Sequence, residues 1–142
     1  MKYENKIVII NGSASGIGLS TAWSFANQGA IVVMTDIQKE AVEKAAQEIN
    51  NSGGKAISFA LDVRSLADFD KIVQECINTY KKIDILVQCS GIYKKIPFLE
   101  MTEQQYDDTL DINLKGAFFC CQRVAKEMVK RKKGKIVCLA SV

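Results

Sequence analysis

Histidine is absent from the 142-residue sequence, proline occurs once, and no apolar run approaches the ~20 residues that span a membrane. The lack of histidine excludes mechanisms that need a histidine base or a histidine metal ligand. One proline with nine glycines excludes collagen-like and proline-rich chains. The first apolar run covers only residues 7–10, too little for a secretory signal. We therefore expect a cytoplasmic protein with no membrane partner.

The five cysteines form no C-x-x-C pair and show no spacing typical of a zinc site. An odd number of cysteines without a signal peptide is typical of a reducing compartment, where thiols pack as small apolar side chains. We expect no metal site.

The formal net charge of +3 comes from a basic cluster within residues 130–135. A nucleic-acid patch is one interpretation of this cluster. Cations at the end of a helix, however, complement its negative terminus. We therefore expect no nucleic-acid partner.

Apolar runs of strand length alternate with stretches of helical period along the whole chain. The strands are expected at residues 7–10, 31–35, 56–61, 83–87 and 136–140. Helices are expected near 19–26, 42–49, 65–80, after 102 and, as a separate long helix, at 117–128. Strands that are apolar on both faces favour parallel pairing with crossover helices. We predict one α/β domain over residues 1–142, a Rossmann-type doubly wound parallel sheet with strand order 3-2-1-4-5.

Two of the helix starts resemble capping boxes, in which a hydroxyl and a side chain three residues later satisfy free amides. Ser65 with Asp68 is one, and Thr102 with Gln105 is the other.

A glycine-rich loop joins the first strand to the first helix, from Asn11 to Gly18. In doubly wound sheets, ligands bind at the carboxyl ends of the strands, and glycines there allow close approach of a pyrophosphate. No lysine follows as a Walker loop requires. A turn with only a structural role is the alternative, but the strand–loop–helix context favours dinucleotide binding.

Asp36 follows the second strand, 18 residues after Gly18. A carboxylate there accepts hydrogen bonds from ribose hydroxyls and repels a 2′-phosphate. Ser15 and Ile37 bring no basic residue to neutralise such a phosphate. NAD is therefore favoured over NADP, with capping of the second helix as the alternative role for Asp36.

Together these patterns resemble the classical subgroup of the short-chain dehydrogenase/reductase family. The family's T-G-x-x-x-G-x-G motif matches the glycine loop with Asn11 in place of threonine. Its acid–apolar pair for adenine matches Asp62-Val63, and its N-x-x-G motif matches residues 113–116. Its fifth strand and substrate-facing serine match residues 134–141.

The resemblance implies hydride transfer between a nicotinamide cofactor and a small-molecule alcohol or carbonyl substrate. It implies that Ser141 bonds the substrate oxygen and that Asn113 holds a water near the active site. It further implies a homodimer or homotetramer in the full-length form. The cofactor-binding residues it implies are Gly12, Ser13, Ser15, Gly16, Ile17, Gly18, Asp36, Ile37, Asp62, Val63, Cys89, Ser90 and Gly91.

The sequence departs from the family in two places. The N-N-A-G motif after the fourth strand reads Gln88-Cys89-Ser90-Gly91, which places its side-chain contacts in doubt. The family's Y-x-x-x-K pair follows the strand-5 serine, whereas this sequence ends at Val142. We therefore expect a fragment or a truncated relative that is inactive alone.

Two other functions stay open on the residues. A non-catalytic dinucleotide-binding module would need neither member of the Y-x-x-x-K pair. A Rossmann-type methyltransferase also holds a ribose with an acid after the second strand. The glycine spacing and the Asn113 motif argue against the methyltransferase.

Overall fold

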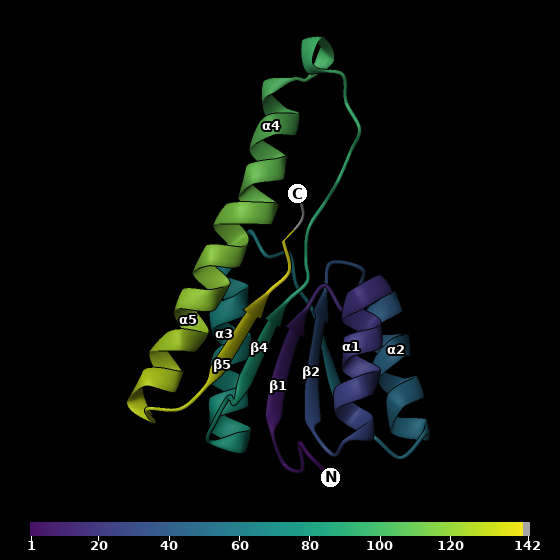
Figure 1. The fold of residues 1–142 in the computed structure, drawn as a ribbon, viewed down its shortest axis with the longest axis vertical. Coiled ribbons are helices and arrows are strands. Elements are labelled where there is room, and N and C mark those ends of the chain that lie inside the picture. Colours follow the sequence, from purple (N-terminus) through teal and green to yellow (C-terminus); the bar gives the residue numbers. More distant parts are fainter. Residues whose placement is uncertain (141–142) are drawn as a thin grey trace.

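The computed structural model describes residues 1–140, in which five parallel strands form one sheet between two layers of helices (Figure 1). The strands lie in the order β3-β2-β1-β4-β5, which confirms the predicted order. Their bounds are β1 (Ile7–Asn11), β2 (Ile31–Asp36), β3 (Lys55–Ala60), β4 (Ile85–Gln88) and β5 (Lys135–Cys138).

The helices follow the strands in alternation and cover both faces of the sheet. They are α1 (Gly16–Asn27), α2 (Lys39–Asn51), α3 (Leu66–Tyr80), α4 (Glu103–Leu110) and α5 (Ala117–Lys130). A 3-10 turn, Phe98–Glu100, precedes α4, and a π-helical turn, Asp111–Gly116, joins α4 to α5.

Strand β1 lies at the centre of two apolar cores because its successive side chains point to opposite faces. Ile7 and Ile9 pack with α3 and α5 on one face. Val8 and Ile10 pack with α1 and α2 on the other. All five residues of β1 are buried, whereas all four residues of the edge strand β5 are exposed. The sheet is therefore most firmly packed where the glycine loop leaves it.

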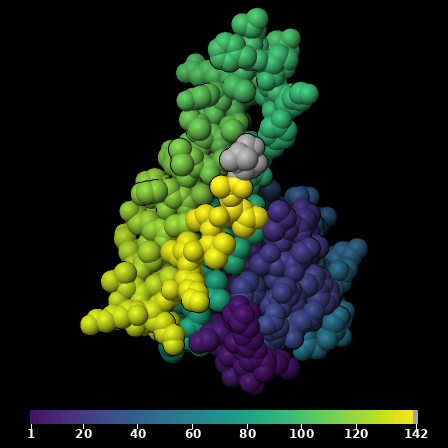
Figure 2. Space-filling view, in the orientation of Figure 1, coloured from purple at the N-terminus to yellow at the C-terminus, as the bar shows by residue number. Residues whose placement is uncertain are grey.

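The segment from α4 to α5 is one continuous helical rod, not the two separate helices that the sequence suggested. Leu110 and Gly116, at the two joints, both keep right-handed helical backbone angles. Gly116 packs closely on the segment after β3, since a Cβ on it would lie 3.0 Å from the Val63 carbonyl oxygen. The α4 end of the rod projects beyond the sheet (Figures 1 and 2).

The two predicted capping boxes have different outcomes. At α4, Gln105 donates its amide to Thr102 Oγ1 and accepts the Thr102 amide, so this box is confirmed. At α3, Ser65 is the N-cap residue but makes no side-chain cap bond. Its hydroxyl donates instead to Asp68 at 2.6 Å. The Ser65 prediction was wrong because an exposed carboxylate competes with the helix amides for this hydroxyl.

A buried carboxylate links three strands at their amino ends, on the opposite side of the sheet from the glycine loop. Asp84 accepts the Ile7 amide at 3.0 Å and pairs with Lys82 at 3.0 Å. Its main chain also bonds to Ile7 and to Lys135, at the starts of β1 and β5. Burial opposes ionisation of Asp84, but the Ile7 amide and Lys82 outweigh it and keep the pKa of this carboxyl below its ordinary value.

All five cysteines are free thiols in the structure. Burial raises the pKa of Cys76 and of Cys120 to about 12, so both remain protonated and act as apolar packing. Cys121 is half-buried and its sulfur lies 3.4 Å from that of the exposed Cys138. Within residues 1–140, no cluster of three or more acidic or cysteine side chains is arranged to hold a metal. None of the helices in that range has the length and apolar character to span a membrane.

Candidate functional site

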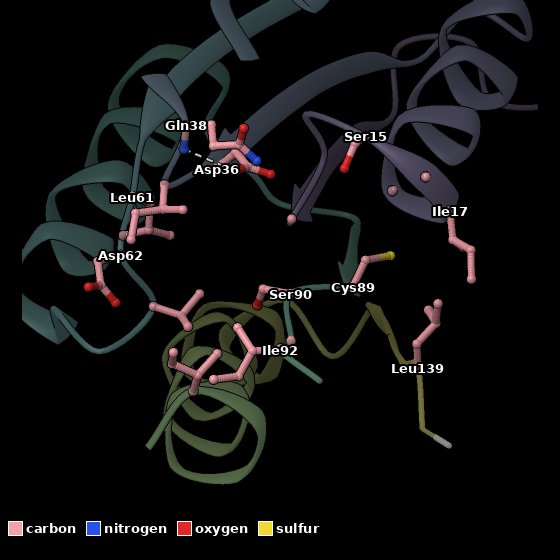
Figure 3. A pocket seen from close by; sticks show the side chains of 17 residues that line it. Ser15, Ile17, Asp36, Gln38, Leu61, Asp62, Cys89, Ser90, Ile92 and Leu139 are labelled. Atoms are coloured by element: carbon pink, nitrogen blue, oxygen red, sulfur yellow. Dashed lines mark hydrogen bonds between the residues drawn. The ribbon is translucent and has the colours of Figure 1, made fainter. Parts of the chain in front are cut away.

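A cleft of about 410 Å³ opens at the carboxyl ends of the strands, between the ends of β1 and β4 (Figure 3). The connections that follow these two strands run to opposite faces of the sheet. This is where doubly wound sheets bind ligands. Its walls are the glycine loop, the ends of β2 and β3, and the segment after β4. The lining residues are Gly12, Ser15, Gly16, Ile17, Gly18, Asp36, Ile37, Gln38, Leu61, Asp62, Val63, Cys89, Ser90, Gly91, Ile92, Ile112 and Leu139.

The glycine loop has no room for side chains at two of its positions. Gly12 has φ +74°, and a Cβ on it would lie 2.7 Å from the backbone of Ser90. A Cβ on Gly18 would overlap the carbonyl oxygen of Gly12. Gly16, in contrast, has φ +54° with open space beside it. The loop is therefore drawn tight against the sheet and leaves an open surface at Gly16.

The amino end of α1 faces this open surface. Ser15 is its N-cap residue but makes no side-chain cap bond, and the first turn carries no acidic residue. The first-turn amides are thus left for a ligand, and the helix dipole adds partial positive charge. A phosphate fits this combination.

Asp36, at the end of β2, holds the loop and the next helix in place. One carboxylate oxygen accepts the Ala14 amide at 3.0 Å. The other accepts the Gln38 amide at 3.0 Å (Figure 3). Each oxygen keeps a further lone pair for ribose hydroxyls. Gln38, not Asp36, is the N-cap residue of α2, and this helix start has no side-chain cap bond. The bond from the Gln38 amide to Asp36 therefore closes a turn before α2, and the capping alternative is wrong.

Next to Asp36 the rim carries no fixed cation. Ile37 is 62% exposed on the rim. Lys39 pairs with Glu43 at 3.9 Å along the exposed face of α2 and is not among the residues lining the cleft.

The far end of the cleft combines two buried apolar side chains with a carboxylate. Leu61 and Val63 are about 95% buried. Asp62 between them accepts a bond from Arg64 at 2.6 Å, which lowers the pKa of Asp62. Arg64 also reaches Asp108 on α4 at 3.1 Å. Arg64 therefore connects this end of the cleft to the helical rod.

The segment after β4, which we call the floor segment, forms another wall of the cleft. Cys89, Ser90 and Gly91 all line the cleft. Gly91 lies close to the helical rod, since a Cβ on it would be 3.3 Å from Asn113 Oδ1.

Asn113, at the π turn, contacts the main chain of this floor segment. Its Oδ1 accepts the Ile92 amide at 2.7 Å and its Nδ2 donates to the Ile92 carbonyl at 2.8 Å. Asn113 is not itself a lining residue, but Ile92 is. The asparagine therefore positions one wall of the cleft.

Two further candidates lie elsewhere. Ser13 is fully buried below the loop, where its hydroxyl donates to the Thr35 carbonyl at 3.2 Å, so it is not part of the cleft wall. Ser141 lies outside the residues that the structure describes.

Two of the side chains that depart from the family pattern, Asn11 and Gln88, bond to each other. Asn11 Nδ2 donates to Gln88 Oε1 at 2.7 Å, and Thr35 Oγ1 donates to Asn11 Oδ1 at 2.7 Å. Gln88 Nε2 in turn donates to Ser90 Oγ. Sequence reasoning missed this row, although the strand order with Asn11 and Gln88, the last residues of β1 and β4, in register with Thr35, the residue before the last of β2, would have predicted it.

Sequence reasoning also missed five lining residues. Each of them neighbours a predicted site residue, lies within a predicted strand or belongs to the helical rod. They are Gln38, Leu61, Ile92, Ile112 and Leu139.

Comparisons with known proteins give a consistent result. The sequence profile of the short chain dehydrogenase family matches residues 6–142. A subunit, BbsD, of (2S)-[(R)-hydroxy(phenyl)methyl]succinyl-CoA dehydrogenase from Thauera aromatica is 38% identical over 99% of this chain and 57% of its own length. The 3-oxoacyl-[acyl-carrier-protein] reductase FabG of Thermotoga maritima is 35% identical over 100% of this chain and 58% of its own length. The NAD-dependent glycerol dehydrogenase of Listeria innocua is 36% identical over 96% and 53%.

Among solved structures, the crystal structure of gox2181 superposes with a TM-score of 0.94 at 32% identity, covering 97% of this chain and 54% of that one. This chain thus spans a little over half the length of the relatives it matches.

Proposed function

Because this chain belongs to the short chain dehydrogenase family, we propose that it supplies the cofactor-binding part of an NAD-dependent oxidoreductase acting on an alcohol or carbonyl substrate. The position of the Asp36 carboxylate is the observation that supports NAD over NADP. Its carboxylate is fixed at the rim by two backbone amides, in a position to accept ribose hydroxyls.

The residues of the cleft fit a nicotinamide dinucleotide along its length. Leu61 and Val63 form an apolar slot for the adenine. The tight loop at Gly12 and the open surface at Gly16 let a diphosphate approach the amides of α1. A nicotinamide dinucleotide held by these residues would supply hydride transfer.

This chain's own contribution is to orient the reactants. The floor segment after β4 forms the wall opposite the glycine loop, and Asn113 holds it through both main-chain atoms of Ile92. In this proposal Asn113 is a positioning residue. Ser141, one residue beyond the described part of the chain, would donate a hydrogen bond to the substrate oxygen and stabilise charge that develops there.

Relatives narrow the substrate only to a class. The names of the matched proteins describe a glycerol dehydrogenase, an acyl-carrier-protein reductase and a CoA-thioester dehydrogenase. All three reactions interconvert a carbinol and a carbonyl. We propose the same interconversion here without assigning a substrate.

Cofactor titration tests the proposal. In the full-length protein, followed by NADH and NADPH fluorescence, NADH should bind at least about tenfold tighter than NADPH, a difference of ~1.4 kcal/mol. The double variant Asp36→Ala with Ile37→Arg should narrow or invert this ratio. Glu40→Ala, which removes an exposed carboxylate of α2 outside the cleft, is the matched control.

Equal affinities for the two cofactors in the unmodified protein would contradict the assignment of NAD. Tight NADH binding without NADH production from a panel of alcohols, including glycerol and 3-hydroxyacyl thioesters, would favour a non-catalytic binding module instead.

A further inference from the structure

We propose that the Ser90 hydroxyl donates a hydrogen bond to the cofactor's ribose–diphosphate segment, and that a buried polar row beneath the cleft sets the direction of this bond. We define the polar row as Thr35, Asn11, Gln88 and Ser90. The inference rests on the nicotinamide dinucleotide site proposed above.

The first three members of the polar row lie side by side on adjacent strands. Asn11 is paired in register with Thr35 of β2 and with Gln88 of β4. All three are at most 2% exposed. A polar side chain buried this deeply is costly unless its groups are hydrogen-bonded. The contacts between these residues are therefore strongly determined.

The hydrogen bonds of the row all point the same way. Thr35 donates to Asn11 and Asn11 donates to Gln88, each at 2.7 Å. Gln88 donates to the hydroxyl oxygen of Ser90. Successive bonds in one direction polarise each other, so the last hydroxyl in the row becomes a better donor.

Burial determines this direction. In the reverse direction, Thr35 would accept from Asn11, and the Thr35 hydroxyl proton would have no partner among residues 1–140 in a place without solvent access. In the observed direction the spare proton is on Ser90, which is only half-buried and lines the cleft. An unsatisfied donor costs least where a ligand or water reaches it.

The place of Ser90 identifies the part of the ligand that it meets. Its backbone packs against Gly12, at the start of the glycine loop. Its hydroxyl lies near the middle of the cleft, between Asp36 on one side and Ile92 on the other (Figure 3). The middle of a dinucleotide is its ribose–diphosphate segment, whose oxygens accept hydrogen bonds. No acceptor for the Ser90 proton lies among the described residues, so the ligand supplies it.

Two substitutions in the full-length protein test the inference through the dissociation constant of NAD, measured by isothermal titration calorimetry. Ser90→Ala removes the donor and should weaken NAD binding about three- to tenfold, the range expected for one hydrogen bond. Gln88→Glu replaces an amide donor by a carboxylate that only accepts. It should draw the Ser90 proton inward and weaken binding at least as much as Ser90→Ala.

Ser20→Ala, an exposed serine of α1 outside the cleft, is the matched control and should bind NAD as the unmodified protein does. If Gln88→Glu does not fold, as judged by circular dichroism, Gln88→Met takes its place. That variant keeps the side-chain length but removes the hydrogen bonds of Gln88, and with them the direction of the row. Its affinity for NAD should fall between that of the unmodified protein and that of Ser90→Ala.

An unchanged dissociation constant for Ser90→Ala would overturn the inference. Weakening by Ser90→Ala with normal binding by the Gln88 variant would overturn the role of the polar row. In either case, tight NAD binding by the unmodified protein that is lost in Asp36→Ala would leave the proposed function standing. Failure of the unmodified protein to bind NAD would contradict both the proposed function and this inference.

Discussion

The two walls of the cleft are built in different ways. The first wall comprises the glycine loop and the ends of β2 and β3, and it rests on the fully buried strand β1. Main-chain bonds fix it, since the amides of Gly12 and Ser13 both donate to the Thr35 carbonyl. The second wall comprises residues 89–92, Ile112 and Leu139. It rests on the exposed edge strand β5 and on a rod whose α4 part has no buried residue.

Under the proposed function, this difference would separate the contacts that any dinucleotide needs from the contacts that one particular substrate needs. The first wall presents amides and glycine surfaces, which main-chain bonds hold for the most part, with an added bond from the Ala14 amide to the Asp36 carboxylate. The second wall is held by single side chains, such as Asn113 on Ile92 and Arg64 on Asp108. Changing one of these side chains can reshape the second wall without disturbing the first. The contrast is therefore between a wall fixed by the fold and a wall fixed by side chains.

The largest expected effect is a substitution in the first wall. In Gly18→Ala, the new Cβ overlaps the Gly12 carbonyl oxygen, although the backbone of Gly18 itself suits alanine. The loop must move, and NAD affinity should fall at least about a hundredfold, ~2.8 kcal/mol. Fluorescence titration with NADH measures it.

Gly53→Ala is the control for this substitution. It introduces a strained alanine at φ +86° with open space around it, far from the cleft. It should lower stability slightly and leave NAD binding unchanged. A Gly18→Ala protein that binds NAD normally would show that the first wall is not fixed by its backbone.

A second prediction concerns Asp84, which ties β1, β4 and β5 together below both walls. Asp84→Asn should lower the free energy of unfolding at neutral pH by about 1.5–3 kcal/mol, as expected for hydrogen bonds to a charged group. Urea denaturation measures this difference. Asp68→Asn, on the exposed face of α3, is the matched control and should have a smaller effect.

The pH dependence of Asp84 has a definite sign. Its pKa in the folded protein is below the ordinary value of 3.8. Its contribution is therefore complete above about pH 4 and is lost as the pH falls through the lower folded-state value. Asp84→Asn should make the loss of stability below pH 4 shallower. An identical acid profile in both proteins would contradict this assignment.

A third prediction concerns the second wall. Asn113→Ala removes both bonds to Ile92, and hydrogen–deuterium exchange of the Ile92 amide should become about tenfold faster, ~1.4 kcal/mol of lost protection. NAD affinity should change by less than about threefold, because the first wall is intact. Asn51→Ala, an exposed residue at the end of α2, is the control. A loss of NAD affinity as large as that of Gly18→Ala would erase the distinction between the walls.

The sequence predicted the first wall better than the second for the same physical reason. Strand periodicity determines the sheet order, and the sheet order places Gly12, Asp36 and Asp62 at one edge. No side-chain partner is needed for that conclusion. The contact of Asn113 with Ile92 joins segments 21 residues apart and depends on how the rod bends. Local pattern carries no information on such a contact.

The polar row shows a second limit of sequence reasoning. When Asn11 and Gln88 are compared singly with the family motifs, each looks like the loss of a motif residue. They lie 77 residues apart, and only their pairing in the sheet shows that one accommodates the other. Two departures at paired positions of a sheet should therefore be evaluated together.

The smallest expected effect compares two helix caps that look alike in sequence. Thr102→Ala removes a capping box at the projecting end of the rod, in which both reciprocal bonds are formed, and should lower the free energy of unfolding by about 1 kcal/mol. Ser65→Ala removes a hydroxyl that bonds Asp68 and caps no amide, so it should cost only about 0.3 kcal/mol. Urea denaturation of both variants in the same buffer gives the comparison, and NAD affinity should be unchanged in each because neither residue lines the cleft. Equal costs would mean that Ser65 caps α3 in solution after all, and that the sequence pattern predicted both helix starts correctly.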